Sequence, residues 1–258
     1  MSIKELAPTY YTRLQEVIRE VDGTTMLLNA GCGDGFYDCF LKAKAKRIVS
    51  LELNRGDVQI AALINPEDTV SYCAASIDEI PCRSNTFDCV ICIEVLEHLD
   101  EDERAIRELV RVLRKGGKLI VTAPSKDFPL VYDPVNYILN RFGKFMRIGI
   151  WSWGHQRLYT AETLQQKFGL TPIRTKLLSH TLVGLLENGY LNSFAQRFTK
   201  TDPKNRDRVR SNLEAIKKSV YYKPPKWLTK IRDFIIRFDN RLFYSSKASI
   251  GIMQVFEK

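Results

Sequence analysis

Three glycines at alternate positions stand in the stretch NAGCGDGFY, residues 29–37, directly after the apolar run TMLL. Gly31, Gly33 and Gly35 let the backbone turn sharply and approach a ligand closely. Dinucleotide-binding proteins use a related glycine pattern, between a strand and a helix, to hold a pyrophosphate. Here the third glycine comes one residue early, and the carboxylate of Asp34 inside the loop would repel a pyrophosphate. The spacing therefore indicates a ligand other than a dinucleotide.

Strand-like and helix-like segments alternate around this loop. The first helix is predicted over residues 10–21, and further helices over Phe36 to Lys44, Gly56 to Ile64 and Asp100 to Gly116, with Asp100 as cap and Gly116 as terminator. A last core helix is capped by Thr160 and stopped by Gly169. The predicted strands are TMLLNA, RIVSLEL, VSYCAAS, FDCVICIEV, KLIVTAP, TPIRTKLLS and SIGIMQVFEK. This order predicts an α/β fold, a Rossmann-like seven-stranded mostly parallel sheet with helices on both faces.

The charge distribution divides the chain. The net charge is +9, and residues 182–248 carry 15 Lys and Arg against 6 Asp and Glu, so this segment holds the whole basic excess. We therefore predict a core over residues 1–181, a basic helical insertion or cap over 182–248, and a closing strand of the core over 249–258. Residues 125–159 interrupt the alternation of strands and helices with an aromatic-rich stretch, which we interpret as a lid over an acceptor.

Four stretches are expected to meet at the carboxyl ends of the strands: the glycine loop, Glu52, ASIDEIP and CIEVLEH. Glu52 lies at the end of the second strand, where a carboxylate can accept both hydroxyls of a ribose. At this point the sequence resembles the class I S-adenosylmethionine (SAM) dependent methyltransferases, especially the large family that includes the quinone-biosynthesis enzymes. The resemblance covers roughly residues 25–180 and is carried by LLNAGCGDG, IDEIPCRSNTFDCVICIEVLEHL and LRKGGKLIVTAPS.

The resemblance implies SAM as the cofactor and assigns roles along these stretches. The glycine loop would approach the methionine and ribose portions, Glu52 would hold the ribose, and the loop after the third strand would meet the adenine. Asn29 stands where the family usually has an acidic residue, and Ser76 where an aspartate is frequent. The implied cofactor-binding residues are Asn29, Gly31, Cys32, Gly33, Gly35, Glu52, Ser76, Ile77, Asp78, Ile93 and Glu94.

Methyl transfer from SAM depends mainly on proximity and orientation, and a hydroxyl or carbon-acid acceptor also needs a base. The chain has three histidines. His155 lies in WGHQRLYT, just before a helix, and is our candidate catalytic base or acceptor-positioning residue. His98 is assigned to capping or packing, and His180 receives no role. Cys89 and Cys92 point to opposite faces of one strand, so no metal site is predicted.

Three functions remain open at this stage. The first is a methyltransferase for a small-molecule or lipid-like acceptor, by in-line displacement beneath the lid. The second is an RNA methyltransferase that uses the basic C-terminal segment, although the chain lacks the Asn/Asp-Pro-Pro-aromatic motif of many amino-group nucleic-acid methylases. The third is a non-catalytic protein that keeps the fold for binding SAM. The sequence does not distinguish O-, N- and C-methylation, or the oligomeric state.

A predicted amphipathic helix over residues 226–243 suggests a partner for the basic segment. Its apolar side is expected to carry Trp227, Leu228, Ile231, Phe234, Ile235, Phe238 and Leu242, while Lys226, Lys230, Arg232, Arg237 and Arg241 occupy or flank the other side. This pattern is typical of a helix that lies on an anionic membrane surface. The alternative is a cap whose apolar side packs on the domain. Because no signal sequence or membrane-spanning run is present, we expect a cytoplasmic protein, and the sequence leaves open whether this helix attaches it to a membrane or caps the site.

Overall fold

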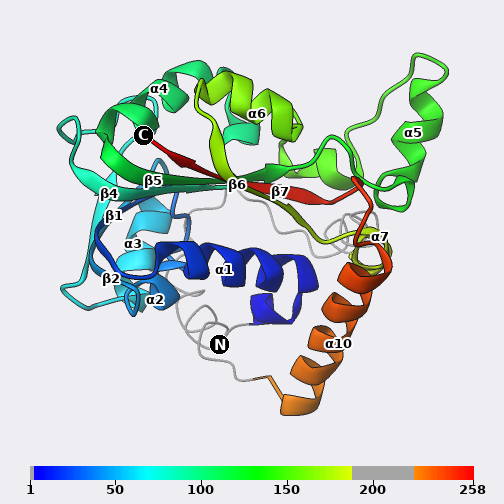
Figure 1. Cartoon of the computed structure of the whole chain (residues 1–258), viewed down its shortest axis with the longest axis horizontal. Coiled ribbons are helices and arrows are strands. Elements are labelled where there is room, and N and C mark those ends of the chain that lie inside the picture. The colour runs from blue at the N-terminus through cyan, green and yellow to red at the C-terminus, as the bar shows by residue number, and fades with distance from the viewer. Residues whose placement is uncertain (1–2, 188–223) are drawn as a thin grey trace.

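The computed structural model describes residues 3–187 and 224–258 and contains one sheet of seven strands. Their order across the sheet is β3-β2-β1-β4-β5-β7-β6, with the first five parallel and β7 antiparallel to both of its neighbours (Figure 1). The predicted α/β fold is therefore confirmed. The strands are β1 Thr24–Ala30, β2 Ala45–Glu52, β3 Val70–Ala74, β4 Phe87–Ile93, β5 Leu113–Pro124, β6 Pro172–Leu178 and β7 Gly251–Glu257.

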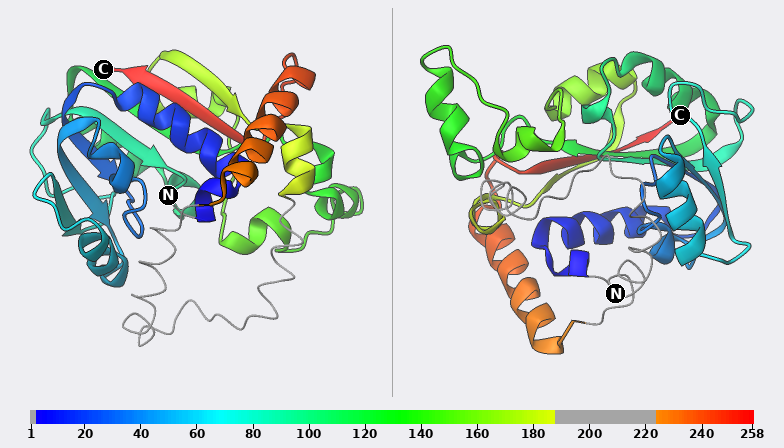
Figure 2. Two further views of the ribbon diagram at one scale, coloured as in Figure 1. Left: turned by 90° about the horizontal axis from the view of Figure 1, so that it is seen from below. Right: turned by 180° about the vertical axis from the view of Figure 1, so that it is seen from behind.

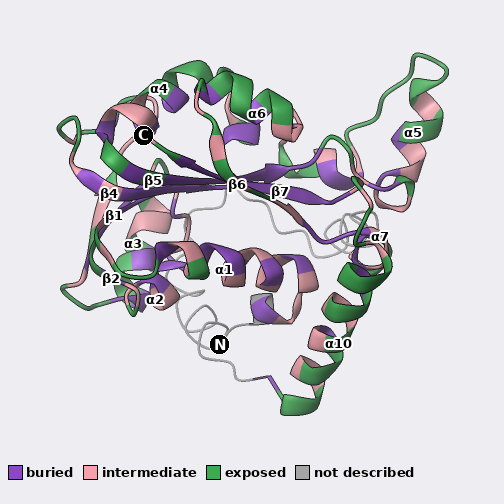
Figure 3. Cartoon of the chain, viewed as in Figure 1, coloured by how far each residue is buried: buried purple, intermediate pink, exposed green. Residues whose placement is uncertain are grey.

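Helices cover both faces of the sheet (Figures 1 and 2). One face carries α4 (Glu103–Val112) and α6 (Ala161–Phe168), and the other carries α1 (Pro8–Val21), α2 (Asp38–Leu41) and α3 (Arg55–Ile64). The core has two parts because each sheet face buries its own set of apolar side chains. Figure 3 shows the strands as the most continuously buried part of the molecule.

Two helix predictions need correction. Only Asp38–Leu41 is helical within the predicted helix from Phe36 to Lys44. The predicted cap Asp100 lies outside α4, which starts after Asp102 and ends at Val112, and Asp102 makes no side-chain cap bond. Asp102 is unavailable as a cap because its carboxylate accepts hydrogen bonds from Tyr159 and Lys167. Leu113 is already extended and pairs with Phe87 of β4, so the sheet ends the helix before the predicted glycine is reached.

The aromatic-rich stretch 125–159 contains regular structure. Its elements are η3 (Leu130–Tyr132), α5 (Pro134–Asn140) and η4 (Gly149–Trp153), where η denotes a 3-10 helix. The α5 helix extends away from the body of the domain (Figure 1). The stretch is anchored at both ends, since Lys126 donates its N–H to the Tyr159 carbonyl and Tyr159 donates its own to Pro124, at 2.7 and 3.1 Å.

The described parts of the basic segment include α7 (Thr181–Leu186) and α10 (Lys226–Leu242). The predicted helix over 226–243 is thereby confirmed, whereas residues 188–223 of the predicted insertion lie outside the described residues. The α10 helix contacts α7, α1 and η1 (Ile3–Leu6) at one edge of the domain (Figure 2). The domain boundaries predicted at residues 181 and 249 stay a prediction. Within the described ranges, no helix is long and apolar enough to cross a membrane.

The α10 helix packs on the domain through polar side chains. Arg232, predicted on the outward polar side, is instead buried, with its guanidinium 3.3 Å from the Tyr11 ring centroid and a 2.7 Å hydrogen bond to the Glu5 carbonyl. Asp239 accepts the backbone N–H groups of His180 and Leu182 at 2.6 and 2.9 Å, which caps the start of α7. Five of the seven residues of the predicted apolar side are exposed, namely Trp227, Ile231, Phe234, Phe238 and Leu242, whereas Leu228 and Ile235 are partly buried (Figure 3).

Candidate active site

The glycine loop follows β1 and is fastened to β2. Gly31 and Cys32 both donate their backbone N–H to the carbonyl of Leu51, at 2.9 and 2.8 Å. Gly31 has φ +83°, and a Cβ at this position would lie 2.4 Å from a methyl carbon of Val95. Only glycine satisfies both conditions, because other residues rarely adopt this backbone region. The first glycine of the motif is thus required by the turn itself.

Glu52, the last residue of β2, faces this loop. Its Oε2 accepts the backbone N–H of Gly33 at 3.0 Å, and its Oε1 accepts that of Asn54 at 2.9 Å. A carboxylate has about four lone-pair positions, so each oxygen keeps acceptor capacity for a ligand hydroxyl. The two backbone hydrogen bonds therefore fix the orientation of the carboxylate and leave lone pairs free to accept from a ligand.

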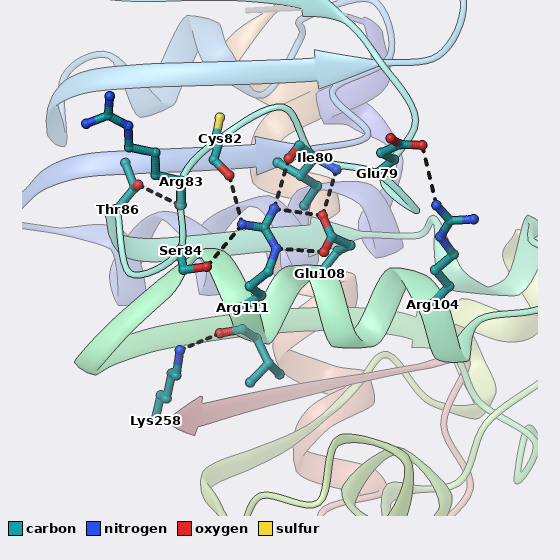
Figure 4. A network of polar contacts seen from close by, with 11 residues as sticks. Glu79, Ile80, Cys82, Arg83, Ser84, Thr86, Arg104, Glu108, Arg111 and Lys258 are labelled. Atoms are coloured by element: carbon teal, nitrogen blue, oxygen red, sulfur yellow. Dashed lines mark hydrogen bonds and ion pairs between the residues drawn. The ribbon is translucent and has the colours of Figure 1, made fainter.

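The loop after β3, which carries Ser76 and Ile77, is braced by α4 (Figure 4). Glu108 accepts the backbone N–H of Ile80 at 2.9 Å. Arg111 donates to the carbonyls of Ile80 and Cys82, both at 2.9 Å, and to Glu108 at 2.6 Å. Hydrogen bonds from Arg111 lower the pKa of Glu108, so the pair stays ionised at neutral pH. An exposed loop is thereby held in a defined conformation.

These elements surround a cavity of about 480 Å³ at the carboxyl ends of β1, β2 and β4. It is the position at which ligands of open parallel sheets bind. The sequence-predicted residues that line this first cavity are Gly31, Cys32, Gly33, Glu52, Ser76, Ile77, Ile93 and Glu94.

Three other predicted cofactor-binding residues do not line the first cavity. Asn29 is buried, and its side-chain amide donates to Asp38 at 2.8 Å. Gly35 packs against α3, where an added Cβ would lie 2.6 Å from that of Ala61. Asp78 accepts a 3.2 Å hydrogen bond from the Ser76 hydroxyl, which shapes the loop. The structure gives these residues supporting positions, and their contact with the cofactor stays a prediction.

The six cysteines are free thiols. Cys89 and Cys92 contribute to opposite faces of the sheet, as predicted. Cys92 is fully buried in the core and, unlike Cys32, lines neither cavity.

The α1 helix supplies two cavity residues that are not among the predicted site residues. Tyr10 and Arg13 lie one turn apart and line the first cavity, whereas Tyr11 lies beneath Arg232. Arg13 forms a 3.0 Å ion pair with Oε2 of Glu94, and Thr122 donates to the other oxygen of Glu94 at 3.0 Å. Glu94 has φ +54°, an uncommon backbone conformation for a residue that is not glycine. The pair fixes the end of β4.

A second cavity of about 400 Å³ adjoins the first. The two cavities share Tyr10, Arg13, Glu94 and His98 in their walls. The aromatic-rich stretch contributes Tyr132, Ile150, Trp153 and His155 to the second cavity. Other aromatic side chains of that stretch do not cover it: Tyr137, Phe142 and Phe145 are exposed, and Tyr159 is buried in the core. The structure thus brings His155 beside the first cavity but not into it.

His155 is placed by a backbone contact between two distant segments. The neighbouring Gln156 donates its N–H to the carbonyl of Glu97 at 2.7 Å, and the rings of His155 and His98 pack edge to face with centroids 4.8 Å apart. Burial, helped by His98 and Arg13, lowers the pKa of His155 to about 4. The imidazole is therefore neutral at pH 7, and its buried Nδ1 has no hydrogen-bond partner among the described residues.

Glu97 lies next to these histidines and was not singled out from the sequence. It belongs to η2 (Leu96–His98) and is fully buried. Burial and then the neighbouring Glu94 raise its pKa well above the usual value. His98, assigned to capping or packing from the sequence, lines both cavities. His180 lies elsewhere, with its Nδ1 2.7 Å from the Ala248 carbonyl.

Comparison with known proteins finds similarity over the N-terminal half of the chain. Residues 28–121 match the family model described as a methyltransferase domain. A probable SAM-dependent methyltransferase of Mycobacterium tuberculosis is 29% identical over 100 residues, which is 39% of this chain and 36% of that protein. A ubiquinone biosynthesis O-methyltransferase of Xanthomonas oryzae is 29% identical over 118 residues, 43% of this chain and 49% of that protein. These matches span less than half of either relative.

Solved structures show the same fold. The cyclase SpnF superposes with a TM-score of 0.58 at 20% identity, covering 96% of this chain and 81% of SpnF. The YcgJ protein of Bacillus subtilis gives a TM-score of 0.55 at 15% identity, covering 96% and 99% of the two chains. Residues 28–121 span the glycine loop, Glu52 and the loop after β3. Over this part, the chain is similar to a methyltransferase domain and to probable SAM-dependent methyltransferases, and it shares their fold class.

Proposed function

We propose that this protein transfers the methyl group of SAM to a small-molecule or lipid-like acceptor. The observation that carries the proposal is the pair of adjoining cavities with a shared wall at Tyr10, Arg13, Glu94 and His98. SAM in the first cavity would place its ribose on Glu52 and its adenine beside Ser76 and Ile77. The methyl group would then face the second cavity, where an acceptor can be held for in-line displacement.

The second cavity suits an acceptor with an apolar body and a polar reacting end. Tyr132, Ile150 and Trp153 supply apolar wall, and His155 supplies a neutral imidazole. We propose that residues 125–159 form the lid over this acceptor and that His155 is the base or orients the reacting atom. Relatives named for ubiquinone and menaquinone biosynthesis support an acceptor of this kind.

Transfer of labelled methyl groups tests the proposal. The purified protein is incubated with methyl-labelled SAM and a cell extract that has been separated into lipid, small-molecule, RNA and protein fractions. Label in the lipid or small-molecule fraction supports the proposal, provided that Glu52→Ala abolishes it. Label in RNA would contradict it and favour the nucleic-acid alternative. SAM binding without label in any fraction would identify a binding protein.

We further propose that a cytoplasmic form of the protein meets an anionic membrane through α10. The exposed apolar side of this helix includes Trp227, Phe234 and Phe238, with 61%, 64% and 47% of each residue exposed. Lys226, Lys230, Arg237 and Arg241 are exposed on the same helix. Basic residues beside a line of large apolar side chains are typical of helices that bind anionic headgroups, and each adds about 1 kcal/mol near the surface.

Co-sedimentation with liposomes tests this contact. Anionic liposomes are expected to retain the protein at low salt, and neutral liposomes to retain less. The double variant Phe234→Glu/Phe238→Glu should lose retention while it keeps SAM binding. Equal recovery of wild type and variant from anionic liposomes would contradict a role for α10.

A further inference from the structure

Three ligand-forming side chains meet in the wall of the second cavity. Glu97 and His98 come from η2, and His155 comes from the end of the aromatic-rich stretch. One ligand atom from each residue lies within 4.8 Å of the other two. They are brought together by the 2.7 Å backbone bond between Gln156 and Glu97, so the cluster is a property of the fold.

The Glu97 carboxylate is the most unusual member of this cluster. It is 0% exposed, and neither oxygen has a hydrogen-bond partner within the described ranges. Nε2 of His98 lies 3.8 Å from its Oε1, too far for a hydrogen bond. A buried carboxylate without partners is costly, because it loses hydration and gains nothing in return. Such a group needs either a proton or a cation beside it.

The nearby Arg13 does not supply the cation that Glu97 needs. The guanidinium of Arg13 is paired with Glu94 at 3.0 Å. The second cavity also contains Glu187, whose carboxylate accepts the backbone N–H of Thr9 at 3.1 Å. Three carboxylates and one guanidinium thus face this cavity, which leaves an excess of negative charge when all are ionised.

The two imidazoles give the cluster its selectivity. Nδ1 of His155 is buried and has no partner among the described residues, so in the tautomer protonated on Nε2 its lone pair can bind an ion. Two imidazole nitrogens with one carboxylate are a common ligand set for zinc and for iron(II), and they suit these ions better than magnesium or calcium. His98 is 40% exposed in its side chain, so its ring can turn toward a common centre.

We propose that Glu97, His98 and His155 bind a divalent transition-metal ion such as zinc or iron(II). Ligand atoms about 2.1 Å from a tetrahedral ion lie about 3.4 Å apart, so the widest pair in this 4.8 Å cluster must close by roughly 1.4 Å. Three protein ligands leave coordination positions open toward the second cavity. If the proposed methyl transfer holds, an oxygen of the acceptor would occupy one of them, and the ion would favour its deprotonated form.

Metal binding is measured on the whole chain, independently of methyl transfer. The protein is stripped with a chelator, dialysed, and titrated with Co²⁺ as a spectroscopic substitute for zinc, with bound metal counted by elemental analysis. We expect one ion per chain and visible absorption bands from imidazole ligation. Zn²⁺ should displace Co²⁺, whereas excess Mg²⁺ should not.

Three variants locate the site. Glu97→Gln and His155→Ala should each weaken Co²⁺ binding by at least about 10–100-fold, the loss that follows even from removal of an outer partner of a metal ligand. His98→Ala serves as a further variant at a half-exposed position, in case a buried change impairs folding. Glu101→Gln is the matched control, since Glu101 is exposed and close in sequence.

The outcomes separate this proposal from the proposed function. Absence of Co²⁺ and Zn²⁺ binding in a folded wild-type protein would overturn the metal site, as would equal binding by wild type and His98→Ala. SAM affinity, measured in the same samples, reports on the first cavity alone. If the protein still binds SAM and methylates an acceptor after complete removal of metal, the proposed function stands and the proposed role of the metal in methyl transfer is contradicted.

Discussion

Replacement of Glu52 by alanine should weaken SAM binding by about two orders of magnitude. Both carboxylate oxygens are held by backbone N–H groups, from Gly33 at 3.0 Å and Asn54 at 2.9 Å, and both keep capacity for a ribose hydroxyl. Each hydrogen bond to a charged group contributes about 1.5–3 kcal/mol. Glu52 is only partly buried, so the lower value applies, and two bonds give about 3 kcal/mol, or roughly 100-fold in Kd.

Isothermal titration calorimetry with SAM measures this loss. Glu52→Gln keeps the shape and one carbonyl oxygen but turns an NH₂ group toward a backbone donor, so we expect about a tenfold loss. Glu79→Ala is the control, since Glu79 is exposed and does not line the first cavity. A folded Glu52→Ala protein that binds SAM within about threefold of wild type would refute the assignment of the ribose position.

Three further predictions concern the elements that support the site. Asp102→Asn should lower the free energy of unfolding by about 3 kcal/mol in a urea titration, because the fully buried carboxylate accepts from Tyr159 and Lys167, both at 2.6 Å. Burial opposes ionisation of Asp102, but these bonds lower its pKa overall. The stability that Asp102 contributes should therefore be complete above about pH 3.9 and disappear as the pH falls through the lowered pKa. The acid unfolding curve of Asp102→Asn should lack this pH-dependent contribution. Arg111→Ala should raise the Kd for SAM about fivefold, since it frees the loop at Ile80, and an unchanged Kd would show that the loop needs no brace.

The order of strands and the place of the first cavity could be predicted from the sequence. Apolar runs separated by helical segments define a parallel sheet, and the glycines and Glu52 fall at strand ends where ligands bind. The capping box of α6 at Thr160 and its end at Gly169 were also predictable, because these signals are local.

The ends of α4 could not be predicted, because they depend on distant partners. Asp102 is held by Tyr159 and Lys167, which follow it by 57 and 65 residues. In the same way, the helical periodicity of α10 does not predict which side of the helix packs against the domain. Arg232 is buried because Tyr11 and the Glu5 carbonyl accept its guanidinium, and both lie at the other end of the chain.

The second cavity required the structure for the same reason. His98 and His155 are far apart in sequence, and contacts between their neighbours, such as that between Gln156 and Glu97, bring their rings together. No sequence feature predicts the burial of Glu97, since an acidic residue beside a short helix is usually exposed. Arg13 was overlooked because a charged residue on an amphipathic helix is normally assigned to the solvent side.

A crystal structure with SAM bound tests the central claim most directly. The ribose hydroxyls should lie within hydrogen-bonding distance of Glu52, the adenine beside Ser76 and Ile77, and the methyl group at the shared wall near Glu94 and His98, directed into the second cavity. A cofactor bound elsewhere would contradict the proposed site. A methyl group directed away from the second cavity would contradict the place proposed for the acceptor.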